Sequence, residues 1–132
     1  MDHRKLVIIP TFNEKENIVE MIHAVMNLPG GFELLVIDDG SPDNTGNLVK
    51  SQQIVFPERL HLIERKGKLG LGTAYITGFK WALEKDYDFI FEMDADFSHN
   101  PNDLIRLYEV CADRSFDLAI GSRYITGVNV VN

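Results

Sequence analysis

The chain contains 132 residues, of which 45% are hydrophobic and 25% charged, a balance that excludes a disordered, collagen-like or coiled-coil protein. Its 13 basic and 20 acidic side chains give a formal net charge of −7, so it lacks the broad basic surface that binds nucleic acid. The single cysteine, Cys111, cannot form an internal disulfide, and the apolar stretches fall far short of the ~20 residues of a membrane helix. We therefore expect one cytoplasmic domain with no nucleic-acid partner.

Hydrophobic patterns predict strands that alternate with helices along the chain. Continuous apolar runs at Lys5–Ile9 and Glu33–Ile37 are typical of strands buried on both faces, as in a parallel sheet. Apolar residues then recur at helical spacing from Glu14 to about Leu28. The remaining elements are a helix from Asp43 or Asn44 to about Gln53, a strand at Arg59–Glu64, a helix from about Gly72 to Lys85, a strand at Phe89–Met93, a helix from Pro101 and a strand at Phe116–Ile120. This order predicts an α/β fold, a doubly wound, mostly parallel sheet with helices on both faces.

The last residues, Thr126–Asn132, do not continue this alternation. They complete no helix and form no obvious cap. We expect a loop there, and a chain truncated within a longer protein.

Polar clusters follow four of the predicted strands, at Pro10–Glu14, Asp38–Ser41, Asp94–His99 and Gly121–Arg123. In open α/β sheets, ligands bind beyond the carboxyl ends of the strands. The four clusters are therefore expected to meet at one ligand-binding edge.

Asp94 and Asp96 form a D-x-D motif directly after a buried strand. In an extended backbone, residues two apart face the same side, so the two carboxylates are expected to project together. Two hard oxygen donors suit Mg²⁺ or Mn²⁺, particularly when a substrate phosphate supplies further ligands. The alternative is a solvated acidic turn that caps the helix near Pro101. The other acidic clusters at the same edge favour the metal site.

Two further clusters each allow two interpretations. One carboxylate of Asp38 and Asp39 is expected to accept hydrogen bonds from a base or ribose while the other shapes the loop, although this segment is also typical of a simple turn. Thr11, Asn13 and Glu14 are candidates for contact with a nucleobase, and Asn13 and Glu14 are equally candidates to cap the next helix.

Gly70 and Gly72 precede a helix whose N-terminus would accept a diphosphate, and Lys68 beside them is either a further contact or a solvated side chain. The segment is no dinucleotide fingerprint, because the third glycine position is Tyr75. Arg123 follows the fifth predicted strand and is expected either to clamp an anion or to pair with an aspartate.

In combination, five motifs resemble the family 2 glycosyltransferases, and within them the polyprenyl (dolichol) phosphate mannosyltransferase group. The motifs are V-I-I-P-T-F-N-E-x-E-N at residues 7–17, V-I-D-D-G-S-P-D at 36–43, G-L-G-T-A-Y-x-x-G-F at 70–79, E-M-D-A-D-F-S-H-x-P at 92–101 and G-S-R-Y at 121–124. The resemblance spans Val7 to Tyr124.

The resemblance implies a GT-A fold, similar to that of other nucleotide-diphospho-sugar transferases, and an inverting transfer of sugar from a nucleotide diphosphate donor. By its motifs, Pro10, Thr11, Glu14 and Asp38 would contact the nucleoside, Asp94 would lie near the ribose and the metal, Asp96 would be the principal metal carboxylate, and Arg123 would face the acceptor phosphate. Asp96 and Arg123 are thus the residues that we expect to be catalytic. Asn44 replaces a commonly seen glycine, a change that we expect to be neutral.

We expect residues 1–132 to form the nucleotide-sugar-binding part of a Mg²⁺- or Mn²⁺-dependent enzyme. Its donor would be GDP-mannose or UDP-glucose, and its acceptor a prenyl phosphate at the cytoplasmic face of the membrane. One alternative is transfer to a sugar hydroxyl, which requires a carboxylate base. Another is a nucleotide-binding fragment without turnover. A third, a phospho-acceptor receiver domain, fits less well because the acidic pair follows the second strand and Arg123 stands where a lysine is expected.

Overall fold

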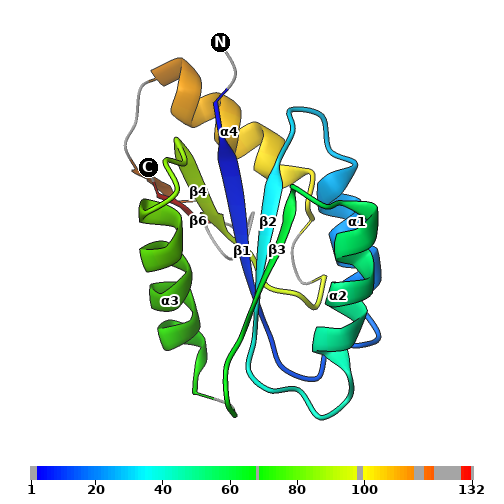
Figure 1. The fold of residues 1–132 in the computed structure, drawn as a ribbon. Coiled ribbons are helices and arrows are strands. Elements are labelled where there is room, and N and C mark those ends of the chain that lie inside the picture. Colours follow the sequence, from blue (N-terminus) through cyan, green and yellow to red (C-terminus); the bar gives the residue numbers. More distant parts are fainter. Residues whose placement is uncertain (1–2, 68, 98–99, 115–117, 121–128, 132) are drawn as a thin grey trace.

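The computed structural model describes residues 3–67, 69–97, 100–114, 118–120 and 129–131, and these residues form one twisted sheet flanked by helices. The strands are β1 (Lys5–Thr11), β2 (Glu33–Asp38), β3 (Leu60–Glu64), β4 (Phe89–Glu92), β5 (Leu118–Ile120) and β6 (Asn129–Val131), in the spatial order β3-β2-β1-β4-β6-β5 (Figure 1). Strands β1 to β4 are parallel, and β6 is antiparallel to both of its neighbours. The predicted doubly wound, mostly parallel sheet is confirmed.

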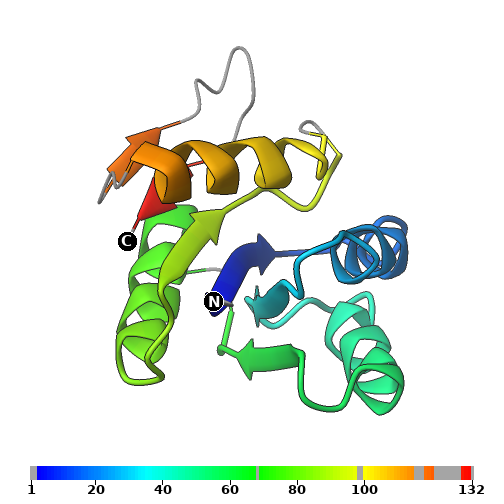
Figure 2. The ribbon, with the colours of Figure 1, turned by 90° about the horizontal axis from the view of Figure 1, so that it is seen from above.

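The helices cover both faces of the sheet because the side chains of each central strand alternate between two cores. Val7 and Ile9 of β1 pack with helices α1 (Ile18–Met26), α2 (Thr45–Val55) and α4 (Asp103–Arg114). Leu6 and Ile8 pack with helix α3 (Leu71–Leu83) on the opposite face. In Figure 2, α3 accordingly lies across the strands from α1 and α2. The described helices are too short or too polar for a transmembrane span.

Helix α1 begins at Ile18, later than the start predicted at Glu14. The carbonyl of Glu14 accepts hydrogen bonds from the N–H groups of Asn17 (3.0 Å) and Ile18 (2.8 Å), so the preceding residues form a turn. Asn13 has a left-handed φ of 54°, which takes it out of any helix. Glu14 therefore begins this turn through its backbone carbonyl, and α1 has no side-chain capping bond, so the predicted capping by the side chains of Asn13 or Glu14 is wrong.

Helix α2 is preceded by Asp43, one of the two predicted caps. Oδ1 of Asp43 accepts hydrogen bonds from the N–H of Thr45 (3.0 Å) and from the Thr45 hydroxyl. Asn44 makes no side-chain capping bond and has a left-handed φ of 73°. Glycine and asparagine are the residues that most readily adopt this conformation, which explains why asparagine can replace glycine there.

The C-terminal strands differ from the prediction. Residues Asn129–Val131, expected to lie in a loop, form β6, which pairs with β4 through Ile90 and Glu92. Strand β5, the described part of the predicted strand Phe116–Ile120, lies beyond β6 at the edge of the sheet. A three-residue strand is too short to carry a periodic pattern, and pairing with a distant strand determines its conformation.

Candidate functional site

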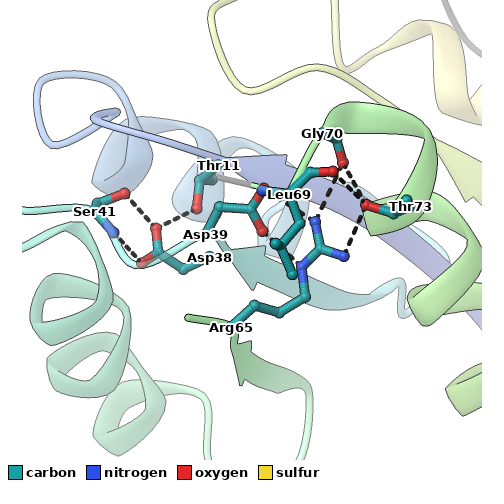
Figure 3. A network of polar contacts seen from close by, with 8 residues as sticks. All are labelled: Thr11, Asp38, Asp39, Ser41, Arg65, Leu69, Gly70 and Thr73. Atoms are coloured by element: carbon teal, nitrogen blue, oxygen red, sulfur yellow. Dashed lines mark hydrogen bonds and ion pairs between the residues drawn. The ribbon is translucent and has the colours of Figure 1, made fainter. Parts of the chain in front are cut away.

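The carboxylate of Asp38 links the ends of β1 and β2 (Figure 3). Its Oδ1 accepts hydrogen bonds from the hydroxyls of Thr11 (2.8 Å) and Ser41 (2.6 Å), and its Oδ2 accepts one from the N–H of Ser41 (3.0 Å). The residue is only 1% exposed. Asp38 thus shapes the loop after β2, and the nucleoside contact implied for it stays a prediction.

The neighbouring carboxylate, Asp39, forms a two-pronged ion pair with Arg65. Nε of Arg65 lies 2.7 Å from Oδ1 of Asp39, and Nη2 lies 3.0 Å from Oδ2. Arg65 also donates to the carbonyl of Gly70 (3.2 Å) and to the hydroxyl of Thr73 (3.0 Å), while the N–H of Leu69 donates to Asp39 (3.3 Å) (Figure 3). The end of β2 is therefore tied to the start of α3.

Arg65 is absent from the residues to which the sequence motifs point. It directly follows β3, and β3 pairs with β2 in the sheet, so the ends of the two strands are neighbours. Once the strand order is known, Arg65 can be identified as a basic residue at the end of the strand next to the one that precedes Asp39.

A cavity of about 310 Å³ opens at the carboxyl ends of β1, β2 and β4 and at the start of α3. It is lined by Pro10, Thr11, Phe12, Glu14, Asp39, Gly70, Asp94, Ala95 and Asp96. The fold thus brings together candidate residues from four separate motifs. Such an edge is where open α/β sheets bind their ligands.

Strand β4 ends at Glu92 and Asp96 lies in a turn, so the two aspartates are not part of the extended strand from which their common orientation was predicted. They nevertheless border the same cavity. Ala95 between them is 4% exposed and packs into the core. The hydroxyl of Tyr75 donates to Oδ1 of Asp94 (3.3 Å), which holds this carboxylate in place, whereas Asp96 is exposed.

Another residue, Asn100, takes part in the turn that precedes the following helix. Helix α4 begins at Asp103, and Oδ1 of Asn100 accepts the hydrogen bond of the Asn102 N–H (3.0 Å) ahead of it. The alternative role of Asp94 and Asp96, as caps of this helix, stays a prediction.

The acidic pair fits a divalent cation that obtains its other ligands elsewhere. Carboxylate oxygens are the ligands that Mg²⁺ and Mn²⁺ prefer, and a magnesium ion commonly keeps water or phosphate oxygens as well. Within the described ranges, no group of three histidine, cysteine, aspartate or glutamate side chains is placed to hold a metal. Asp94 and Asp96 would hold such an ion together with a bound phosphate.

Some candidate residues lie elsewhere. Asn13 borders a neighbouring cavity of about 470 Å³, and its N–H donates to the hydroxyl of Ser41 (2.9 Å). Gly72 is exposed in the first turn of α3 and does not line the cavity that contains Asp94. Lys68 and Arg123 lie outside the described residues, so their roles stay predictions.

Comparison with protein families identifies the relatives of this chain. The model of "Glycosyl transferase family 2" matches residues 6–132. The chain is 47% identical to the polyprenol monophosphomannose synthase of Mycolicibacterium smegmatis and 45% identical to the undecaprenyl-phosphate mannosyltransferase of Micrococcus luteus. Each match covers 98% of this chain, but 48% and 52% of the relative. The chain thus spans about half the length of these relatives.

Solved structures agree with this relationship. The mannosyltransferase PcManGT from Pyrobaculum calidifontis, solved in complex with GDP-Man and Mn²⁺, superposes with a TM-score of 0.65 and 27% identity over 73% of this chain and 28% of its own. Staphylococcus aureus TarS 1–349 in complex with UDP-GlcNAc superposes with a TM-score of 0.66 and 25% identity over 87% of this chain and 33% of its own. The fold is therefore of the GT-A type, and the chain belongs to glycosyl transferase family 2.

Proposed function

We propose that residues 1–132 are the nucleotide-sugar-binding part of an inverting glycosyltransferase that transfers mannose or glucose to a polyprenyl phosphate. The observation that carries this proposal is the cavity at the carboxyl edge of the sheet, where Asp39, Gly70, Asp94 and Asp96 meet. The names of the relatives, which include polyprenyl-phosphate mannosyltransferases, support this acceptor class. The neighbour solved with GDP-Man and Mn²⁺ supports a nucleotide-sugar donor.

The donor would lie along the cavity, with its nucleoside against Pro10, Thr11 and Asp39 and its diphosphate toward Asp94 and Asp96. These acidic side chains oppose a diphosphate, by about 4 kcal/mol for each close pair of charges at an effective dielectric constant of 20. A bound Mg²⁺ or Mn²⁺ supplies positive charge that offsets this repulsion and stabilises the leaving diphosphate. Tyr75 would keep Asp94 oriented for this task through its hydroxyl.

A prenyl phosphate is an acceptor that can react without a strong general base from the protein. A phosphate monoester has a second pKa of about 6, so it is mostly ionised near pH 7 and needs no strong general base. Arg123 would orient it, because a guanidinium binds phosphate oxygens in pairs. The reaction would take place at the cytoplasmic face of a membrane that holds the prenyl chain.

Replacement of Asp96 tests the donor site. We expect Asp96→Ala to abolish metal-dependent binding of GDP-mannose and UDP-glucose, since it removes the carboxylate proposed as the principal metal ligand. Glu109→Ala, which removes an equal charge from an exposed position on α4, is the matched control and should bind as the unaltered chain does. The measurement is titration calorimetry of each donor with and without Mn²⁺.

The outcomes separate the alternatives. Unchanged donor affinity in Asp96→Ala contradicts the assignment of the metal site. A chain that binds a donor but releases no sugar to either a prenyl phosphate or a sugar acceptor is a binding fragment without turnover. Transfer to a sugar hydroxyl and not to prenyl phosphate would replace the proposed acceptor.

A further inference from the structure

We infer that Arg65 is a positioning residue for donor binding, one that holds the Asp39 and Gly70 wall of the cavity in place. The inference rests on the proposed function and deepens it, because it concerns how that donor site is kept ready for its ligand. Arg65 itself does not line the cavity. It acts through Asp39 and Gly70, which do.

The side chain of Arg65 joins three separate points of the chain. It reaches Asp39 after β2, the carbonyl of Gly70 immediately before α3, and the hydroxyl of Thr73 in the first turn of α3 (Figure 3). The side chains of Arg65 and Asp39 are only 10% and 8% exposed, so water screens their interaction little.

Arginine suits this position because it offers five N–H donors in a planar fork. Two of its nitrogens bind the two oxygens of Asp39, and the same head group still reaches Gly70 and Thr73. A lysine carries the same charge on a single nitrogen and cannot bridge acceptors that are spread in this way.

Backbone contacts also hold the segments that follow β2 and β3 close together. The N–H of Arg65 donates to the carbonyl of Asp38 (2.7 Å), and the N–H of Asp39 donates to the carbonyl of Thr11 (3.0 Å). Gly40 has a φ of 68°, and a Cβ there would lie 2.8 Å from the nitrogen of Gly67. The loops after β2 and β3 therefore lie directly against each other, and the Arg65 side chain extends this link to α3.

The charge of Arg65 also matters for the proposed ligand. Asp39 shares the cavity with Glu14, Asp94 and Asp96. Arg65 offsets the negative charge of Asp39, so the repulsion between the cavity and an incoming diphosphate is smaller. By binding both oxygens of Asp39, it also fixes the orientation of this carboxylate. Loss of the contacts of Arg65 with Asp39, Gly70 and Thr73 is expected to weaken donor binding even when the protein remains folded.

Thr73 offers the cleanest test, because its replacement leaves the buried ion pair intact. Thr73→Val removes the hydroxyl that accepts from Arg65 and donates to the carbonyls of Leu69 and Gly70, whereas Thr73→Ser keeps it. Arg65→Lys keeps the positive charge but cannot bind Asp39, Gly70 and Thr73 at the same time. Lys50→Gln is the matched control, since it breaks an exposed ion pair with Glu64 (2.8 Å) and neither of these residues lines the cavity.

Binding of GDP in the presence of Mn²⁺ is measured by calorimetry for each variant, with the thermal unfolding midpoint measured in parallel. We expect Thr73→Val and Arg65→Lys to weaken GDP binding by about 10-fold, the effect typical of residues that orient direct ligands. Thr73→Ser and Lys50→Gln should bind as the unaltered chain does.

Two results would overturn the inference. If Thr73→Val and Arg65→Lys lower the unfolding midpoint but bind GDP with unchanged affinity, Arg65 serves stability alone, and the proposed function still stands. If the unaltered chain binds neither GDP nor UDP with Mn²⁺, the donor site itself is refuted, and the positioning role falls with it.

Discussion

Asp38 and Asp39 are adjacent in the sequence but have different partners in the structure. Asp38 accepts hydrogen bonds from Thr11 and Ser41 and is buried within its own loop. Asp39 pairs with Arg65 and borders the cavity. The sequence predicted that one of the two carboxylates shapes the loop, and in the structure Asp38 makes the hydrogen bonds within that loop. Their partners Thr11, in β1, and Arg65, directly after β3, are distant along the chain.

A third carboxylate, Asp43, gives a pH-dependent prediction. Burial raises its pKa, but hydrogen bonds from Thr45 and Lys15, together with the charge of Lys15, outweigh burial and lower the pKa below its ordinary value of 3.8. A carboxylate with a lowered folded-state pKa stabilises the fold above its unfolded pKa and loses this effect as the pH falls through the folded pKa. Asp43→Ala should therefore cost about 1 kcal/mol at pH 7, as loss of a capping bond does.

The destabilisation caused by Asp43→Ala should shrink as the pH falls below about 4 and through the lowered folded-state pKa of Asp43, because Asp43 of the unaltered chain then becomes protonated. Urea unfolding of both proteins at a series of pH values measures this difference. Glu109→Ala serves as the control for loss of an exposed charge. An equal cost of Asp43→Ala at pH 7 and at pH 2 would show that its ionisation does not contribute.

Among the elements, helix α3 lies in close contact with the sheet at Gly78. A Cβ added at Gly78 would lie 2.8 and 2.9 Å from the side chain of Ile8 and 3.0 Å from that of Ile37, and both isoleucines are fully buried. The helical pattern of this segment could be recognised from the sequence, but not its distance from β1 and β2. That distance follows from the contact of a glycine with two branched side chains.

Gly78→Ala is accordingly expected to destabilise the protein by about 1–3 kcal/mol, since it inserts a methyl group into a packed core. Gly46→Ala is the matched control in α2. There the added Cβ would lie 2.9 Å from Oε2 of Glu64, a half-exposed side chain that can move away. That change should be neutral or stabilising by up to about 1 kcal/mol through helix propensity. Chemical denaturation of both variants measures the contrast, and equal costs would show that α3 does not depend on close contact.

At the scale of the whole molecule, the net charge of −7 opposes the binding of a nucleotide diphosphate. The arginine closest to the cavity in the described part of the chain, Arg65, is already paired with Asp39. Membership in glycosyl transferase family 2 contradicts the receiver-domain hypothesis, and the proposed metal ion would offset this repulsion.

This charge balance predicts an unusual dependence on salt. Without a divalent metal, binding of GDP should become about two- to threefold tighter from low ionic strength to about 0.2 M salt, because salt screens the repulsion. Guanosine, which carries no phosphate, should be insensitive. Calorimetric titrations of both ligands at several salt concentrations provide the measurement. If GDP binding weakens as salt is added, a local basic group dominates the site in place of the overall charge.

Local patterns were enough to predict the alternation of strands and helices, the parallel sheet and the edge at which Thr11, Asp39, Asp94 and Asp96 meet. Each of these depends on local periodicity and on the general rule that parallel strands end at one edge. The folded chain was needed to find the place of β6, the different partners of Asp38 and Asp39, and the contacts of Arg65 with Asp39, Gly70 and Thr73. These depend on strand order and on contacts between residues far apart in the chain, which local patterns do not encode.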